Sequence, residues 1–81
     1  MHELALARTI VDQILEVVER ERLGQVSRVV LELGTAAGVE VEALSLGFEV
    51  AARSSAVEGA ALEIERVADS HDLRVKVLEA S

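Results

Sequence analysis

Apolar residues recur at helical spacing over the first part of the chain. Within positions 4–23 they fall three or four residues apart, which is the spacing of one face of an α-helix. The stripe consists of Leu4, Ala7, Ile10, Val11, Ile14, Val17 and Val18. Gly24 follows it, and glycine commonly supplies the left-handed conformation that ends a helix. The pattern predicts an amphipathic helix that packs this stripe against a core.

Two further elements follow along the chain. The segment QVSRVVLELG alternates between two faces, which is typical of a strand with one buried side. The two faces consist of Val29, Leu31 and Leu33 on one side and Arg28, Val30 and Glu32 on the other. The segment VEVEALSLGFEVAAR returns to helical spacing, with Leu44, Phe48 and Ala51 on one face. It therefore predicts a second helix.

Two short alternating runs end the chain, AALEIERV and DLRVKVLEA, with the polar loop ADSHD between them. A connection of this length is typical of a β-hairpin, so we expect the two runs to pair with each other as antiparallel strands. In that arrangement Glu63 and Glu65 would face Arg74 and Lys76 on the exposed side of the sheet, where opposite charges favour the pairing.

The predicted order of elements is helix, strand, helix, strand, strand. A helix joins the first two strands, so they should be parallel with a right-handed crossover. We therefore expect an α/β (α+β) two-layer sandwich, in which a three-stranded mixed sheet carries both helices on one face. At 81 residues the chain is the size of one domain, spanning positions 1–81.

Composition excludes several classes of partner. The formal net charge is −7, which disfavours nucleic acid and anionic membranes. Phe48 is the only aromatic residue, which argues against binding single-stranded nucleic acid by stacking. The start lacks the features of a signal peptide, and no apolar stretch reaches the roughly 20 residues that span a bilayer. We expect a cytoplasmic protein.

Catalytic motifs are absent from the sequence. Gly34 and Gly38 do not have the spacing of a phosphate-binding loop, and no lysine follows them. The chain has no cysteine, which excludes disulfides and thiolate metal sites. Only two histidines could act as a base for a nucleophile. We therefore expect no enzyme activity.

The first three residues, Met1, His2 and Glu3, have the composition of a metal chelate. A free α-amine titrates near pH 8 and an imidazole near pH 6.5, so both supply neutral nitrogens near neutrality. With the backbone nitrogens of His2 and Glu3 they could surround a metal in a plane, with the Glu3 carboxylate close by. Such coordination suits Ni(II) or Cu(II) and requires a free amine on Met1. The alternative is a solvated terminus, with Glu3 placed favourably at the start of a helix.

The second histidine, His71, lies in the predicted hairpin loop among carboxylates. Its simplest interpretation is an exposed side chain with no metal role. It could join a metal site only if the fold, or a second copy of the chain, brought this loop close to the N-terminus.

Several segments together resemble one family. MHELALARTIVDQILE, RVVLELGTAAGVEVEALSLGFEVAARSSAVEGAALEIERV and the closing LRVKVLEAS resemble, in order, the HypA/HybF family, nickel-incorporation proteins of NiFe-hydrogenase maturation. The resemblance implies a metallochaperone that binds Ni(II) through Met1, His2 and Glu3. It also implies transfer of the metal, together with a HypB-type GTPase, to the large subunit of the nickel enzyme.

One departure from the family is large. Its members normally carry a zinc-binding insertion with two Cys-x-x-Cys pairs between the second and third strands, and here only a short loop near 68–72 stands in that place. We therefore expect no zinc, in either a zinc-less variant or a piece trimmed to its nickel domain. The lost packing and an exposed sheet edge favour a homodimer or a strand-exchanged oligomer.

Two functions from different classes follow. The first is a Ni(II)-binding metallochaperone for maturation of NiFe-hydrogenase or another nickel enzyme. The alternative is a protein-interaction or assembly module of the same fold that binds no metal, with a merely solvated N-terminus.

Overall fold

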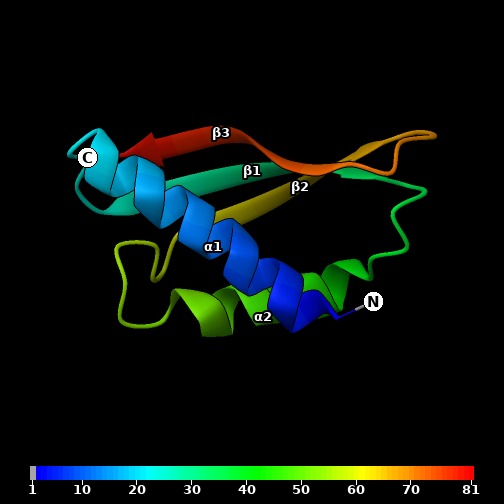
Figure 1. The fold of residues 1–81 in the computed structure, drawn as a ribbon, viewed down its shortest axis with the longest axis horizontal. Coiled ribbons are helices and arrows are strands. Elements are labelled where there is room, and N and C mark those ends of the chain that lie inside the picture. The colour runs from blue at the N-terminus through cyan, green and yellow to red at the C-terminus, as the bar shows by residue number, and fades with distance from the viewer. Residues whose placement is uncertain (1) are drawn as a thin grey trace.

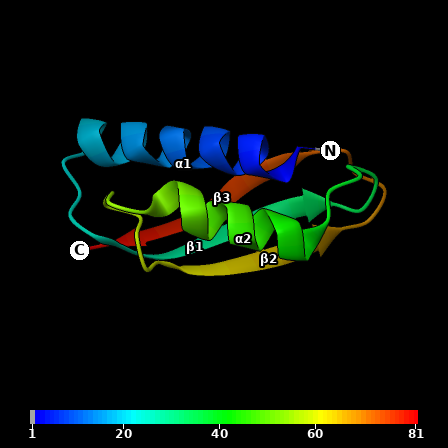
Figure 2. The same cartoon turned by 90° about the horizontal axis from the view of Figure 1, so that it is seen from below.

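The computed structural model describes residues 2–81, and Met1 lies outside the described residues. Two helices cover one face of a three-stranded sheet (Figures 1 and 2). The elements in chain order are α1 (Glu3–Arg20), β1 (Val26–Gly34), α2 (Val41–Ala52), β2 (Ala61–Val67) and β3 (Leu73–Ala80). The predicted order and the mixed two-layer sandwich are confirmed.

The core lies between the helices and the inner face of the sheet. The predicted stripe of α1 is buried there, together with one face of α2 and the inner face of β1. Its buried members include Ala7, Ile10, Val11, Ile14, Leu31, Leu44 and Phe48. The helical and strand periodicities therefore identified the packed faces, except that Leu4 at the start of the stripe is 44% exposed and Val17 and Ala51 are only partly buried. Among residues 2–81, fourteen apolar residues are buried. They lie on α1, β1 and α2, apart from Val57 in the connection after α2, and none of them lies on β2 or β3.

The sheet order is β2-β1-β3, so the predicted hairpin is wrong. β1 pairs with β2 in parallel and with β3 in antiparallel fashion. The connection 68–72 crosses the end of β1 instead of turning back beside β2. Two strand spacings amount to about 10 Å, which a short connection can span. This order places the most apolar strand in the centre, where both of its edges are hydrogen-bonded.

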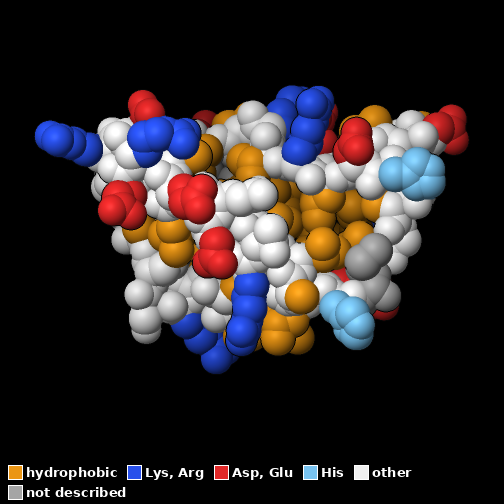
Figure 3. Space-filling model, in the orientation of Figure 1, with side chains coloured by type: hydrophobic (Ala, Val, Ile, Leu, Met, Phe, Trp, Pro, Cys, Tyr) orange, Lys and Arg blue, Asp and Glu red, His pale blue; other side chains and the backbone are white. Residues whose placement is uncertain are grey.

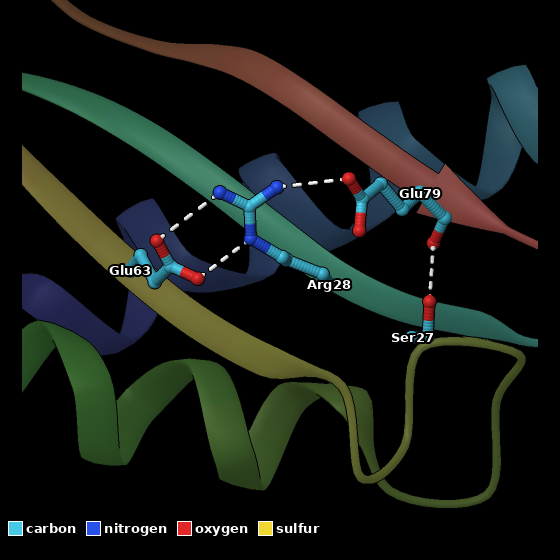
Figure 4. A network of polar contacts seen from close by, with 4 residues as sticks. All are labelled: Ser27, Arg28, Glu63 and Glu79. Carbon is cyan, nitrogen blue, oxygen red and sulfur yellow. Dashed lines mark hydrogen bonds and ion pairs between the residues drawn. The ribbon is translucent and has the colours of Figure 1, made fainter.

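Ion pairs cross the outer face of the sheet. Only the Lys76–Glu65 pair joins β2 and β3, the two strands whose charges were expected to face each other. Lys76 Nζ lies 2.7 Å from Glu65 Oε1, even though β1 separates their strands, whereas Arg74 pairs with Glu32 of β1 at 2.7 Å. Arg28 contacts Glu63 on one side at 2.6 Å and Glu79 on the other at 2.9 Å (Figure 4). The hydrogen bond from Arg28 lowers the pKa of Glu63. Exposed pairs of this kind contribute little to the stability of a fold, because water and salt screen the charges.

Val30 is only 1 % exposed although it belongs to the outer, polar face of β1. In register it lies between Glu63 of β2 and Val77 of β3. Long charged side chains cover apolar surface with their aliphatic stems, and the ion-paired Arg28 lies two positions away on the same face. The outer face therefore has a small apolar centre beneath its charges.

The connection 68–72 is held firmly against the end of β1. Gly34 N donates to Asp72 O at 2.8 Å, Thr35 N to Val67 O at 2.9 Å and Ala36 N to Ser70 O at 2.9 Å. A Cβ atom on Gly34 would overlap the Ser70 carbonyl. The chain thus closes at this end through backbone hydrogen bonds that require glycine at position 34.

Within residues 2–81, none of the helices combines the length and the apolar character needed to cross a membrane.

Gly34→Ala should destabilise the fold by about 1–3 kcal/mol, because the new methyl group forces the Ser70 carbonyl away and loosens its hydrogen bonds. Chemical denaturation followed by circular dichroism measures this directly. Ala36→Ser, an exposed change two positions away, should shift the free energy of unfolding by less than about 0.5 kcal/mol. Equal stability of Gly34→Ala and wild type would contradict the close packing of this loop.

Candidate metal centre at the N-terminus

The start of α1 leaves main-chain nitrogens available next to His2. The helix begins at Glu3 with His2 as its N-cap, and Leu6 N donates to His2 O at 3.1 Å, the first bond of the helix. The first N–H groups of any helix have no acceptor within it. The backbone nitrogen of Glu3 is one of these, so helix formation does not consume it.

The His2 side chain is exposed and makes no capping hydrogen bond. It borders a shallow hollow together with Leu4, Ala5 and Arg8. Its imidazole is therefore free to turn toward the main-chain nitrogens beside it. Of the three predicted ligands, Met1 lies outside the described residues.

The Glu3 carboxylate is anchored to the other helix. Its Oε2 accepts a hydrogen bond from the backbone N–H of Glu40, the residue directly before α2, at 3.2 Å. This bond is the main reason why the pKa of Glu3 lies below its usual value of 4.5. A carboxylate is also favoured there by the dipole of α2. Sequence reasoning missed this contact, because Glu3 and Glu40 lie in segments that are far apart along the chain.

A close approach of the two helices supports the same arrangement. A Cβ on Gly47 of α2 would lie 3.2 Å from Leu4 Cα and 3.4 Å from Glu3 O. The missing side chain at position 47 lets the first turn of α1 settle directly on α2. Together with the Glu3–Glu40 hydrogen bond, this contact holds the first turn of α1 in a defined place.

The loop that carries His71 lies at the same end of the molecule as the N-terminus (Figures 1 and 2). His71 Nδ1 lies 3.1 Å from Ala36 O, in the same β1–α2 connection that ends at Glu40. In Figure 3 the two histidine side chains, in pale blue, lie at this end of the molecule. The fold thus brings this loop to the same end of the molecule as the N-terminus, and the His71 ring contacts the backbone of Ala36 there.

The described side chains do not form a metal cluster by themselves. Residues 2–81 contain no group of three or more His, Cys, Asp or Glu side chains placed to hold an ion. The donors that this end does offer are the His2 imidazole and main-chain nitrogens such as Glu3 N, and nitrogen donors of this kind suit Ni(II) or Cu(II).

Glu3→Gln should reduce the stability of the metal-free protein in a pH-dependent way. Folding lowers the pKa of Glu3 below 4.5, so its ionised form stabilises the fold above pH 4.5, and this stabilisation is lost as the pH falls through the lowered pKa. The Tm difference between wild type and Glu3→Gln should be largest near neutrality and shrink below pH 4.5. Glu16→Gln, on the exposed face of α1, should show no such trend. A Tm difference for Glu3→Gln that is constant with pH would contradict the Glu3–Glu40 contact.

Comparison with known proteins places this chain in one family. The family model described as "Hydrogenase/urease nickel incorporation, metallochaperone, hypA" matches residues 1–72. The hydrogenase maturation factor HypA of Beijerinckia indica is 47% identical over 64 residues, which cover 79% of this chain and 57% of that protein. HypA of an Azoarcus species is 43% identical over 70 residues, covering 86% and 61%. The chain therefore spans only about three-fifths of the length of these relatives.

A solved structure shares the fold. The solution structure of the Ni metallochaperone HypA from Helicobacter pylori superposes with a TM-score of 0.75 at 22% identity, covering 83% of this chain and 58% of that one. Its likeness supports the arrangement of helices and strands. The matched model and the identities above show more: this chain belongs to the HypA family.

Proposed function

We propose that this protein is a Ni(II)-binding metallochaperone for the maturation of a NiFe-hydrogenase or another nickel enzyme, and that it carries the metal without catalytic turnover. The observation that carries the proposal is the start of α1 at Glu3. It leaves an exposed imidazole beside main-chain nitrogens that the helix does not use, in a chain of the HypA family.

The proposed ligands come from Met1, His2 and Glu3. The α-amine, the backbone nitrogen and imidazole of His2, and the backbone nitrogen of Glu3 would supply four nitrogens to Ni(II), a donor set that this ion favours. The Glu3 carboxylate, which accepts a hydrogen bond from Glu40 N, would mainly hold the site in place. The metal is cargo, so an exposed site suits both its uptake and its release.

The partners follow from the family. The large subunit of the nickel enzyme is the proposed recipient of the metal, and a HypB-type GTPase is the proposed partner in its delivery. No zinc site is proposed, because the chain has no cysteine and the connection 68–72 closes on β1 through backbone hydrogen bonds. Chelating agents should accordingly leave the fold of the metal-free protein intact.

The alternative function is a protein-interaction or assembly module that binds no metal. It is favoured by one observation, that side chains 2–81 form no metal cluster of their own. A titration with Ni(II) separates the two functions.

Calorimetric titration of Ni(II) into protein with a free Met1 amine should show one-to-one binding. His2→Ala should weaken this binding by about tenfold or more, because it removes a ligand. His71→Ala is the matched control, since it removes the only other histidine, and it should leave the affinity unchanged. Equal affinities of wild type and His2→Ala would contradict the proposed ligands.

The affinity for Ni(II) should fall steeply below about pH 6.5, because protons compete with the metal for an imidazole and an amine. Titrations between pH 8 and pH 5.5 measure this dependence, with a buffer that does not bind nickel. An affinity that stays flat over this interval would indicate carboxylate ligands instead.

A further inference from the structure

β3 is an edge strand beside an exposed apolar groove. Its inner face and α1 leave a gap in which the core is visible, and Figure 3 shows hydrophobic side chains gathered in that hollow. The groove is lined by Ile14, Val17, Leu73, Val75 and Leu78, with Gln13 and Arg74 at its rim. Apolar surface of this kind at a free strand edge is a common site for pairing with another chain.

The side chains of β3 follow a pattern that is the same in both directions. Leu73, Val75, Leu78 and Ala80 pack on the inner, apolar side. Arg74, Lys76 and Glu79 form ion pairs on the outer side, and Val77 lies opposite the outward Val30. A bulge between Val75 and Val77 produces this symmetry, because two outward residues stand in the middle of the strand.

The backbone groups at the free edge have the same symmetry. On the side of β1, Ser81 N donates to Gln25 O and Ser81 O accepts from Gly24 N, directly before that strand. On the same side, Glu79 O accepts from Ser27 Oγ and Asp72 O accepts from Gly34 N. Because backbone groups of a strand alternate between its two edges, those of Leu73, Val75, Leu78 and Ala80 point to the free edge. An antiparallel copy of β3, related by a two-fold axis between positions 76 and 77, would oppose Val75 with Leu78 and Leu73 with Ala80. Each of these pairs could exchange hydrogen bonds.

The charges agree with this register. The same two-fold axis places Arg74 opposite Glu79 of the second copy, twice in each pair of chains. Arg74 uses its Nε for Glu32, and Glu79 uses Oε2 for Arg28. Within residues 2–81 the Arg74 terminal nitrogens and Glu79 Oε1 form no hydrogen bond. The Lys76 side chain does not block pairing at the free edge, since its Nζ reaches across the outer face to Glu65 Oε1 at 2.7 Å.

We propose that β3 is a self-pairing surface, at which two copies of this chain join their sheets into one six-stranded sheet about a two-fold axis. Outer-face charges set the register through Arg74 and Glu79, and the two apolar grooves meet on the inner face, where each α1 covers the seam. The proposal is independent of nickel, and its test uses metal-free protein.

Sedimentation equilibrium of wild type and three charge variants tests the register. Glu79→Lys and Arg74→Glu each place like charges opposite each other twice, so each should raise the dimer dissociation constant by about tenfold or more. A mixture of the two variants should recover the dimer, because in the mixed pair a lysine faces a glutamate at one contact and Arg74 faces Glu79 at the other. Circular dichroism confirms that each variant is folded.

Glu63→Lys is the matched control. Glu63 bonds the same Arg28 as Glu79 and has a similar exposed side-chain fraction, 52% against 54%, but it lies on β2 at the opposite edge. Its substitution should leave the dissociation constant unchanged. A wild-type protein that stays monomeric up to about 1 mM, a mixture that does not recover the dimer, or equal weakening by Glu63→Lys would each overturn the proposal.

A cross-link provides a second measurement that does not depend on charge. The chain has no cysteine, so one introduced by Lys76→Cys would stand beside its symmetry mate at the axis, within the Cα separation that a disulfide allows. Mild oxidation should give a covalent dimer with Lys76→Cys and much less with Glu65→Cys, which replaces the ion-pair partner on β2. Equal cross-linking of the two variants would contradict pairing through β3.

Discussion

The central position of β1 is the constraint on which the rest of the molecule depends. It is the most deeply buried strand, and hydrogen bonds occupy both of its edges, parallel to β2 and antiparallel to β3. Once β1 is central, the chain must cross its end between β2 and β3, and the connection 68–72 docks onto Gly34 and Ala36 to do so. The same order leaves β2 and β3 as free edges.

That end of β1 also organises the candidate metal centre. The β1–α2 connection begins with residues that hold the His71 loop and ends at Glu40, whose N–H anchors the carboxylate of Glu3. The first turn of α1 is held there by this bond and by its close contact with Gly47. The first turn of α1 is thereby held on α2 while the His2 imidazole stays exposed, as the proposed uptake and release of a metal would require.

Periodicity predicted the elements and their buried faces, but it could not predict which strands are neighbours. The alternation in β2 and β3 tells which side chains face the core, and that pattern is the same for a hairpin and for two strands on either side of β1. The predicted Lys76–Glu65 pair forms even though the predicted hairpin was wrong, because the two long side chains reach across the intervening β1. The burial of Val30 was missed for a related reason, since it depends on neighbours from both flanking strands. At the candidate metal centre, the order of Met1, His2 and Glu3 suggested the chemistry, whereas the anchoring of Glu3 depends on the distant Glu40.

The central claim is that main-chain nitrogens at the start of the chain, including the free amine, bind Ni(II). The most direct test adds one glycine before Met1 and compares the Ni(II) affinity with that of the protein with a free Met1 amine. Every side chain is kept, but the amine moves away from the imidazole. The account predicts that binding is largely lost, while the thermal stability of the metal-free protein stays the same. An unchanged affinity in the extended protein would contradict the claim.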